Sequence, residues 1–266
     1  MRRMLLLAIL SLFLTPLFAK NHSASIAQAV ETTSESHCYF VPPPGWEIAD
    51  PSTLSSKVKI AFLKNSGKGF CPSINLAIEE TDVSLSEYLK AVKTIHEQDR
   101  KNQWRALGKV RTVAGMAQLT EIDSTTDWGP VRILQLILIK DKHAYVITAA
   151  ALKEEISNYY KEVQTAFRSL TISHDLLQNI PQQERRDMLK DQQTALLAAA
   201  SSSSSEKACF EDPIFLEKNY LPFQKMVIDN FADMGAFWQI LVLRNVHEKL
   251  HYIPETKRTD SYEKID

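Results

Sequence analysis

The chain has 266 residues, of which 44% are hydrophobic and 24% are charged, and its formal net charge is −1 at pH 7. This composition is that of an ordinary globular protein, and the length suits one medium domain with an appendage or two small domains. The near-neutral charge excludes an overall electrostatic attraction to nucleic acid or to an acidic membrane surface.

The N-terminus has the order of a secretory signal. Two arginines precede an apolar run over residues 4–18, and small residues follow it. This order predicts a periplasmic or secreted chain in which residues 1–29 are signal peptide and leader, cleaved after Ala19 or Ala29. The alternative is that the run stays as a membrane anchor, although it is short for a span, and no other transmembrane span is expected. Residues 30–37 lack periodicity and are expected to be disordered.

The first ordered segments predict strands. Cys38–Val41 is a short strand that ends at three prolines, since proline cannot donate a ladder hydrogen bond. Lys57–Leu63 and Ser73–Glu80 each alternate in hydrophobicity, and the Gly-containing segment between them, 65–69, is typical of a hairpin tip.

A helix is predicted to follow. Ser84 and Glu87 have the spacing of a capping box, in which a hydroxyl and a carboxylate satisfy the first free backbone donors. Apolar residues then recur at helical spacing as far as Arg100, and His96 on the apolar side is expected to be a core histidine. A further strand is expected over Trp104–Val113.

Three more strands are predicted over Met116–Asp123, Val131–Ile139 and Ala144–Ala150. In Val131–Ile139, apolar residues occupy both alternating sets of positions, and Gln135 interrupts one of them. Side chains alternate between the faces of a strand, so this segment should be the central strand of a sheet covered on both faces. Trp46 and Trp128 lie in loops and are expected to pack at the core edge rather than to contact a ligand.

Lys153–Leu170 completes this part of the chain as a strongly amphipathic helix. Runs of strands joined by short turns, with two helices among them, predict an α+β fold: an antiparallel sheet sandwiched by α-helices.

Three features invite comparison with a known fold: the first strand ending in Pro44-Gly45-Trp46, the helix start Ser86-Glu87-Tyr88-Leu89, and the last hairpin running into the helix over Tyr159–Phe167. With these features residues 38–172, about half of the chain, resemble the PsbP-like fold family. The resemblance implies a binding or adaptor module without shared catalytic residues, and a PsbP-like domain over residues 38–173.

Beyond that domain the sequence predicts an α-helical extension. It comprises a helix over 174–200, a Ser-rich linker over 201–208, a C-terminal helical region over 209–253 and a loose tail over 254–266. Its last helix should cover Phe223–Ile253, with an interruption considered at Gly235. From Met234 to Leu243 this helix is apolar nearly all round and too short to span a bilayer, so it must be buried against the first domain, another copy or a partner.

The sharpest motif is an HExxH at His247-Glu248-Lys249-Leu250-His251. On a helix, two histidines at this spacing can hold Zn²⁺ while the glutamate activates a metal-bound water. Only 15 residues follow it, and the candidate third ligands there, Glu255, Asp260 and Glu263, lie in a polar tail. A histidine pair at a helix end is therefore the preferred interpretation, and a zinc-dependent hydrolase with Glu248 catalytic is the alternative.

Three cysteines are present: Cys38, Cys71 and Cys209. Export favours disulfides, and the first two are expected at strand starts of the same domain, so Cys38 and Cys71 are the candidate pair. Buried free thiols are the alternative.

The expected function is an exported, non-enzymatic binding, adaptor or scaffold protein of the cell envelope. It should need no cofactor and bind no nucleic acid, and it should contact a protein partner through the C-terminal helical region. A homo-oligomer formed through residues 231–243 remains as a further alternative.

Overall fold

The computed structural model describes residues 36–65, 69–202 and 209–251. These residues group into two units: the described part of 42–171 forms the first, and residues 36–41 join the described part of 172–251 in the second. The predicted signal peptide and leader (1–29), the disordered segment (30–37) up to residue 35, most of the linker and the tail lie outside the described residues. No helix in the described part is both long and apolar enough to cross a membrane.

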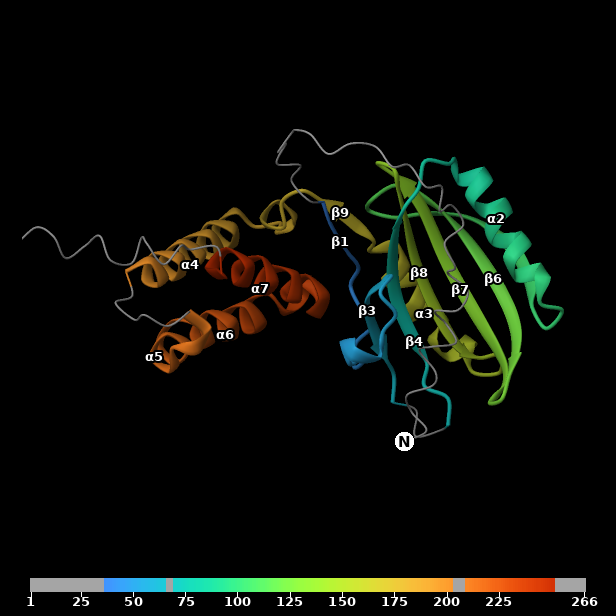
Figure 1. Cartoon of the computed structure of the whole chain (residues 1–266), viewed down its shortest axis with the longest axis horizontal. Helices are drawn as coiled ribbons and strands as arrows, with labels where there is room; N and C mark the ends of the chain where they lie inside the picture. Colours follow the sequence, from blue (N-terminus) through green and yellow to red (C-terminus); the bar gives the residue numbers. More distant parts are fainter. Residues whose placement is uncertain (1–35, 66–68, 203–208, 252–266) are drawn as a thin grey trace, which may run out of the picture. The chain divides into compact units, whose positions relative to one another are not determined.

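The first unit is built on a seven-stranded antiparallel sheet with the order β2-β3-β4-β8-β7-β6-β5 (Figure 1). The strands are β2 (Glu47–Ile48), β3 (Val58–Leu63), β4 (Ser73–Glu80), β5 (Gln103–Arg111), β6 (Met116–Thr126), β7 (Gly129–Lys140) and β8 (His143–Leu152). Each strand predicted from residue 57 onward is present. The fold is therefore α+β, as predicted.

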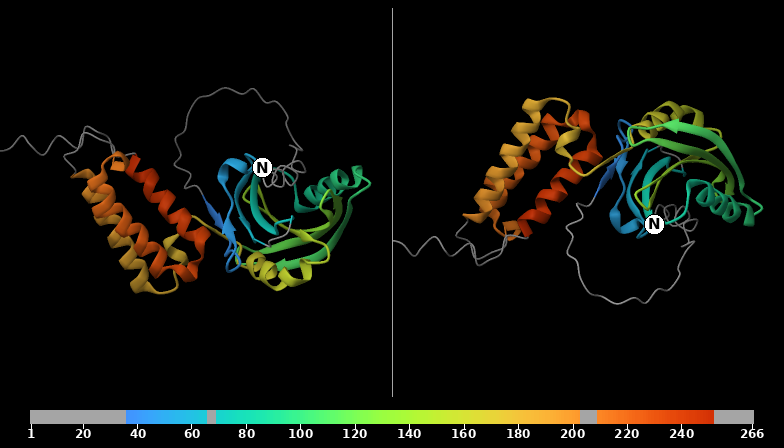
Figure 2. Two further views of the ribbon diagram at one scale, coloured as in Figure 1. Left: turned by 90° about the horizontal axis from the view of Figure 1, so that it is seen from below. Right: turned by 90° about the horizontal axis from the view of Figure 1, so that it is seen from above.

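Helix α2 (Leu85–Gln98) crosses from β4 to the far edge strand β5, and the chain then returns by successive hairpins until β8 pairs with β4. Helix α3 (Ile156–Arg168) follows β8. The two helices lie on opposite sides of the curved sheet (Figure 2). This is the predicted sandwich of a sheet between helices.

Strand β7 is buried on both faces along most of its length, as predicted, because β6 and β8 flank it and both sheet faces are covered there. The middle position of the sheet belongs to β8, whose residues are even more completely buried. The alternation of side chains sends Leu134 and Leu136 to the face that α3 covers and Ile133 and Ile137 to the face of α2.

The start of α2 has the predicted capping box. Glu87 N–H donates to Ser84 Oγ at 3.3 Å, and Ser84 N–H donates to a Glu87 carboxylate oxygen at 2.9 Å. His96 on the inner side of this helix is buried, and burial lowers its pKa. The prediction of a core histidine is confirmed.

An ion network lies on the α3 face of β6 and β7. The guanidinium of Arg132 donates to both carboxylate oxygens of Asp123, at 2.7 and 2.8 Å, and Lys153 Nζ lies 2.8 Å from Asp123 Oδ2. The hydrogen bond from Arg132, helped by Lys153, lowers the pKa of Asp123 to about 2. Arg105 pairs with the buried Glu121 beside it.

The second unit is mainly helical and contains α4 (Gln183–Ser201), the short α5 (Pro213–Phe215), α6 (Leu221–Asn230) and α7 (Ala236–His251). Strand β1 (His37–Tyr39) forms a separate two-stranded sheet with β9 (Thr171–Ser173). The sequence predicted the strand at Cys38 as part of the first domain, whereas in the structure it groups with the second unit and its hydrogen-bonding partner is β9.

The predicted helix over Phe223–Ile253 is two helices, with the break at Gly235. This glycine has φ +84°, a left-handed backbone conformation that interrupts a right-handed helix and costs other residues more than glycine. Gln239 Nε2 in α7 donates to the carbonyls of Val227 and Ile228 in α6, at 3.3 and 3.0 Å, which ties the two helices together.

The apolar stretch of α7 forms the core of the second unit. Trp238 is fully buried, and its Nε1 donates to Leu176 O at 3.2 Å. Its ring packs on Phe231 at a centroid distance of 5.4 Å. The apolar surface from Met234 to Leu243 is therefore largely buried within its own unit. The main sequence argument for an external partner on that stretch no longer holds.

Candidate functional site

A row of four polar side chains crosses the α2 face of the sheet in the first unit. Thr120 of β6 lies opposite Gln135 of β7, Gln135 lies opposite Thr148 of β8, and Thr148 lies opposite Asn75 of β4. Directly paired residues of an antiparallel sheet point to the same face, so the four side chains stand side by side. We call these four residues the polar row.

The polar row is buried. The exposed fractions are 0% for Thr120, 8% for Gln135, 6% for Thr148 and 3% for Asn75. A buried polar group without a hydrogen bond costs about 1–3 kcal/mol, so such groups are normally paired. Four of them aligned in the interior of a sheet face need an explanation.

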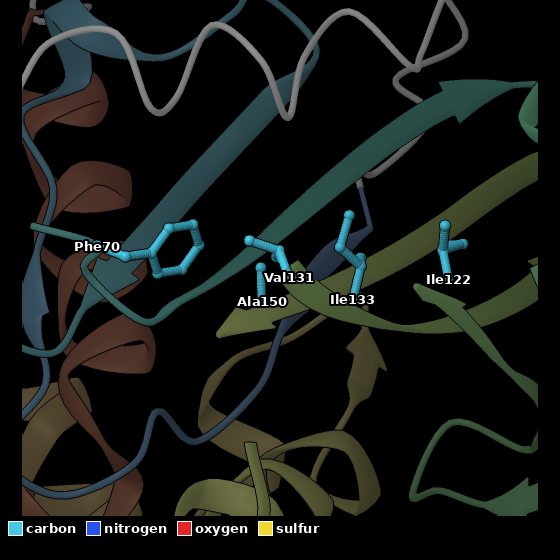
Figure 3. Close-up of a cluster of buried hydrophobic side chains, with 5 residues drawn as sticks. All are labelled: Phe70, Ile122, Val131, Ile133 and Ala150. Carbon is cyan, nitrogen blue, oxygen red and sulfur yellow. The ribbon is translucent and has the colours of Figure 1, made fainter. Parts of the chain in front are cut away.

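Apolar clusters lie on both sides of the polar row. One, the Phe70 cluster, consists of Phe70, Ile122, Val131, Ile133 and Ala150, and Figure 3 shows its side chains lying in a line along the sheet. The other, the Tyr88 cluster, consists of Tyr88, Val92, Ile137, Ala144 and Val146. Trp104 of β5 packs against both clusters.

The two clusters differ in what packs on them. The Tyr88 cluster contains Tyr88 and Val92 of α2, so a helix covers that end of the face. The residues in and against the Phe70 cluster come from strands and connecting loops, with no helix residue among the described ones. Trp128, from the turn between β6 and β7, packs there with its ring 6.3 Å from that of Phe70, as predicted for a core-edge tryptophan.

Three polar atoms around the row are without a hydrogen-bond partner among the described residues: Thr120 Oγ1, Gln135 Oε1 and Trp104 Nε1. Thr120 and Gln135 are direct neighbours, and Trp104 lies opposite Ile122, two residues along β6 from Thr120. A hydroxyl donates and accepts, an amide oxygen accepts and an indole N–H donates. Together they offer both kinds of hydrogen bond to a molecule with an apolar body.

No side chain of the polar row ionises near neutral pH, so the row itself supplies hydrogen bonds rather than a general acid or base. No sequence motif indicated this site. Its one signal was Gln135, an amide inside an otherwise apolar strand, and only the strand register brings the other three residues beside it.

The HExxH residues lie in the second unit, at the end of α7, in an aromatic cluster. The ring of Phe210 stacks on His247 at a centroid distance of 4.0 Å and lies 5.3 Å from His251, while the two imidazoles are 4.5 Å apart. Glu248 is exposed and lies 3.6 Å from Arg244 Nε. The structure thus brings the two histidines together and turns Glu248 toward an arginine, and the candidate third ligands lie outside the described residues.

The described residues contain no group of three His, Cys, Asp or Glu side chains placed to hold a metal ion. The zinc hypothesis thus gains no further ligand from this part of the chain and stays a prediction.

The structure has no disulfide between Cys38 and Cys71, and their pairing stays a prediction. Cys38 lies in β1 of the second unit, whereas Cys71 lies just before β4 of the first. Burial raises the pKa of the Cys38 thiol strongly, which suppresses the reactive thiolate. Cys71 is only partly buried.

No family model matches this chain, and no curated protein matches it. Solved structures of similar fold include LpqN of Mycobacterium tuberculosis, involved in cell envelope biogenesis (13% identity, 54% of this chain and 87% of that one, TM-score 0.41). The cyanobacterial PsbP of Synechocystis shares 13% identity over 55% of this chain and 97% of its own, with a TM-score of 0.38. The Ran-binding protein Mog1p of Saccharomyces cerevisiae shares 19% identity over 50% of this chain and 89% of its own, with a TM-score of 0.36. These similarities concern the fold alone and assign no residue or activity to this chain.

Proposed function

We propose that this protein is an exported, non-enzymatic binding protein that holds an amphipathic ligand on the α2 face of its sheet. The supporting observation is the polar row, in which two directly opposed side chains leave Thr120 Oγ1 and Gln135 Oε1 unbonded among the described residues. Export rests on the N-terminal sequence.

The ligand is expected to have an apolar body and one small hydrogen-bonding head group. The body suits the Phe70 cluster, because its side chains are aliphatic or aromatic and no described helix residue packs on them. The head group suits the polar row, where a hydroxyl can donate to Gln135 Oε1, or accept from the nearby Trp104 Nε1. Binding sites of this kind are mostly apolar with a few polar groups that fix orientation.

A competition experiment tests the proposal with the mature chain, beginning at Val30. A dansyl-labelled undecanoic acid serves as the fluorescent probe, and 1-dodecanol and dodecane serve as competitors of equal chain length. We expect dodecanol to displace the probe about tenfold better than dodecane, because only the alcohol can satisfy the polar row.

The double variant Thr120→Val/Gln135→Leu should bind both competitors alike, while Thr171→Val, a buried threonine in β9, should keep the preference for the alcohol. Absence of probe binding, or a preference for the alcohol that survives the double variant, would overturn the proposal.

A protein partner for the second unit is a second candidate role. Ile214, Leu221 and Ile228 recur at intervals of seven residues along the run from α5 to α6, and they are 63%, 51% and 47% exposed. Large exposed apolar side chains that recur along one helical run favour an interaction surface, for a partner or for a second copy of the chain.

Replacing all three residues by glutamate in the full chain should abolish cross-linking to the partner without lowering the melting temperature, since none of them is buried. Light scattering separates the alternatives: a dimer that becomes monomeric in the triple variant indicates self-association. Unchanged cross-linking would contradict the adaptor role.

A further inference from the structure

The second unit contains a polar pocket of about 130 Å³ that none of the sequence motifs indicated. One water molecule needs roughly 10–15 Å³ of such space, so the pocket has room for a molecule of several non-hydrogen atoms. Its polar lining comes from four parts of the unit: His37, His174, Asp175, Gln193, Asn245 and Lys249.

Local structure explains why these residues meet. His37 begins β1 and His174 directly follows β9, so the pairing of the two short strands brings both imidazoles to the pocket. Asn245 and Lys249 are four residues apart in α7 and therefore share one face of that helix. Gln193 enters from α4 and is nine-tenths buried.

The lining is rich in donors. Lys249 offers an ammonium group, Gln193 and Asn245 offer amide N–H groups, and the imidazoles of His37 and His174 can donate as well. Asp175 is the one carboxylate among the described lining residues, and its Oδ1 already accepts the backbone N–H of Leu177 at 2.9 Å. Lys249 and His174 are exposed at the rim, whereas Gln193 lies deep.

We infer that this pocket binds a small anion that carries a carboxylate or phosphate group. A cationic ammonium with several neutral donors complements oxygens that only accept, and hydrogen bonds between charged groups are about twice as strong as neutral ones. The pocket size limits the ligand to one compact group of this kind. The inference is independent of the sheet-face site, because all the lining residues belong to the second unit.

NMR titration of the full mature chain tests the inference. Inorganic phosphate and acetate are the two probes, each added at constant ionic strength set with NaCl, and the imidazole carbon-bound protons of His37 and His174 are followed. We expect saturable chemical-shift changes at both histidines. The probe that binds with the higher affinity identifies which acid group the pocket prefers.

Four variants sharpen the test. Lys249→Gln removes the positive charge at the rim, and His174→Phe removes the imidazole N–H donors. Each should weaken binding about tenfold. Lys225→Gln is the matched control, because Lys225 is an exposed lysine of the same unit that pairs with Asp229 instead. The sheet-face variant Gln135→Leu should leave anion binding unchanged.

Shifts that do not saturate would overturn the inference, and so would equal weakening by Lys249→Gln and Lys225→Gln, which indicates diffuse surface attraction. A folded Lys249→Gln variant with wild-type affinity would overturn it as well.

Discussion

Thr120 and Gln135 lie directly opposite each other on β6 and β7, yet the hydroxyl of one and the amide oxygen of the other have no hydrogen-bond partner among the described residues. In a sheet interior such a pair is normally joined or replaced by apolar residues. The pair lies between two apolar clusters, and its unbonded polar atoms do not stabilise the fold.

The unbonded hydroxyl predicts an unusual stability effect. Thr120→Val removes a buried polar atom without a partner, so in the absence of ligand the free energy of unfolding should stay the same or rise by up to about 1 kcal/mol. Thr171→Val is the control, because Thr171 Oγ1 donates to Ser169 O at 2.9 Å, and its loss should cost about 1 kcal/mol. Urea denaturation measures both. An equal loss in the two variants would mean that Thr120 has a partner in solution.

The capping box predicts a cost at the start of α2. Ser84→Ala removes the acceptor of the Glu87 N–H and should lower the free energy of unfolding by about 1 kcal/mol. Ser86→Ala, two residues further on at an exposed helical position, should be neutral or slightly stabilising, because alanine is the better helix former. The two variants are compared by chemical denaturation, and a larger loss in Ser86→Ala would contradict the assigned helix start.

The ion network predicts a specific acid sensitivity. The pKa of Asp123 is about 2 in the folded chain, below the unfolded value of roughly 3.9. Its carboxylate therefore stabilises the fold above pH 4, and this contribution is lost as the pH falls through about 2. Asp123→Asn should lower the free energy of unfolding by about 2 kcal/mol at pH 7, with a difference from the wild type that vanishes near pH 2.

Denaturation at a series of pH values checks this prediction. Asp233→Asn is a control, because Asp233 pairs with Arg185 but is mostly exposed. A pH-independent difference between Asp123→Asn and the wild type would contradict the role of the charge.

The cysteines should react in a fixed order. In the native, reduced chain Cys71 should be alkylated by iodoacetamide first, because burial raises the pKa of Cys38 and shields it. Mass spectrometry of peptides sampled over time gives the order. If neither Cys38 nor Cys71 reacts in the exported protein until a reductant is added, the two are joined by the predicted disulfide.

The stacking of Phe210 on His247 predicts which substitution the second unit tolerates. His247→Phe should keep the aromatic contact and most of the stability, whereas His247→Ala should lose about 1 kcal/mol.

We expect the purified chain to carry no stoichiometric zinc, measured by elemental analysis. Zinc that is bound by the wild type and lost in His247→Phe would instead show the metal site on which the hydrolase alternative depends.

The sequence predicted those features that depend on neighbouring residues. Ser84 and Glu87 are three residues apart, so their capping box could be recognised directly, and the apolar alternation of Val131–Ile139 gave an inner strand of the sheet. Cys38 was placed in the first domain, because nothing in a three-residue strand specifies its pairing with β9.

The candidate sites depend on distant residues and were therefore missed. Asn75 and Thr148 are separated by α2 and three strands, and they meet only through the register of β4 and β8. Phe210 likewise reaches His247 from a segment before α5. Conversely, the apolar run of α7 suggested an external partner because its partners within the unit could not be seen in the sequence.

The pairing of β4 with β8 also has a consequence for the time course of folding. Strands β5 to β8 are joined by short turns, so they can pair with their neighbours in sequence. Pairing of β4 with β8 requires closure of the whole intervening loop, which is entropically costly. Asn75 is therefore the last of the four polar residues to come into line, and a nascent or partly refolded chain would carry three of them in register while the fourth is still absent.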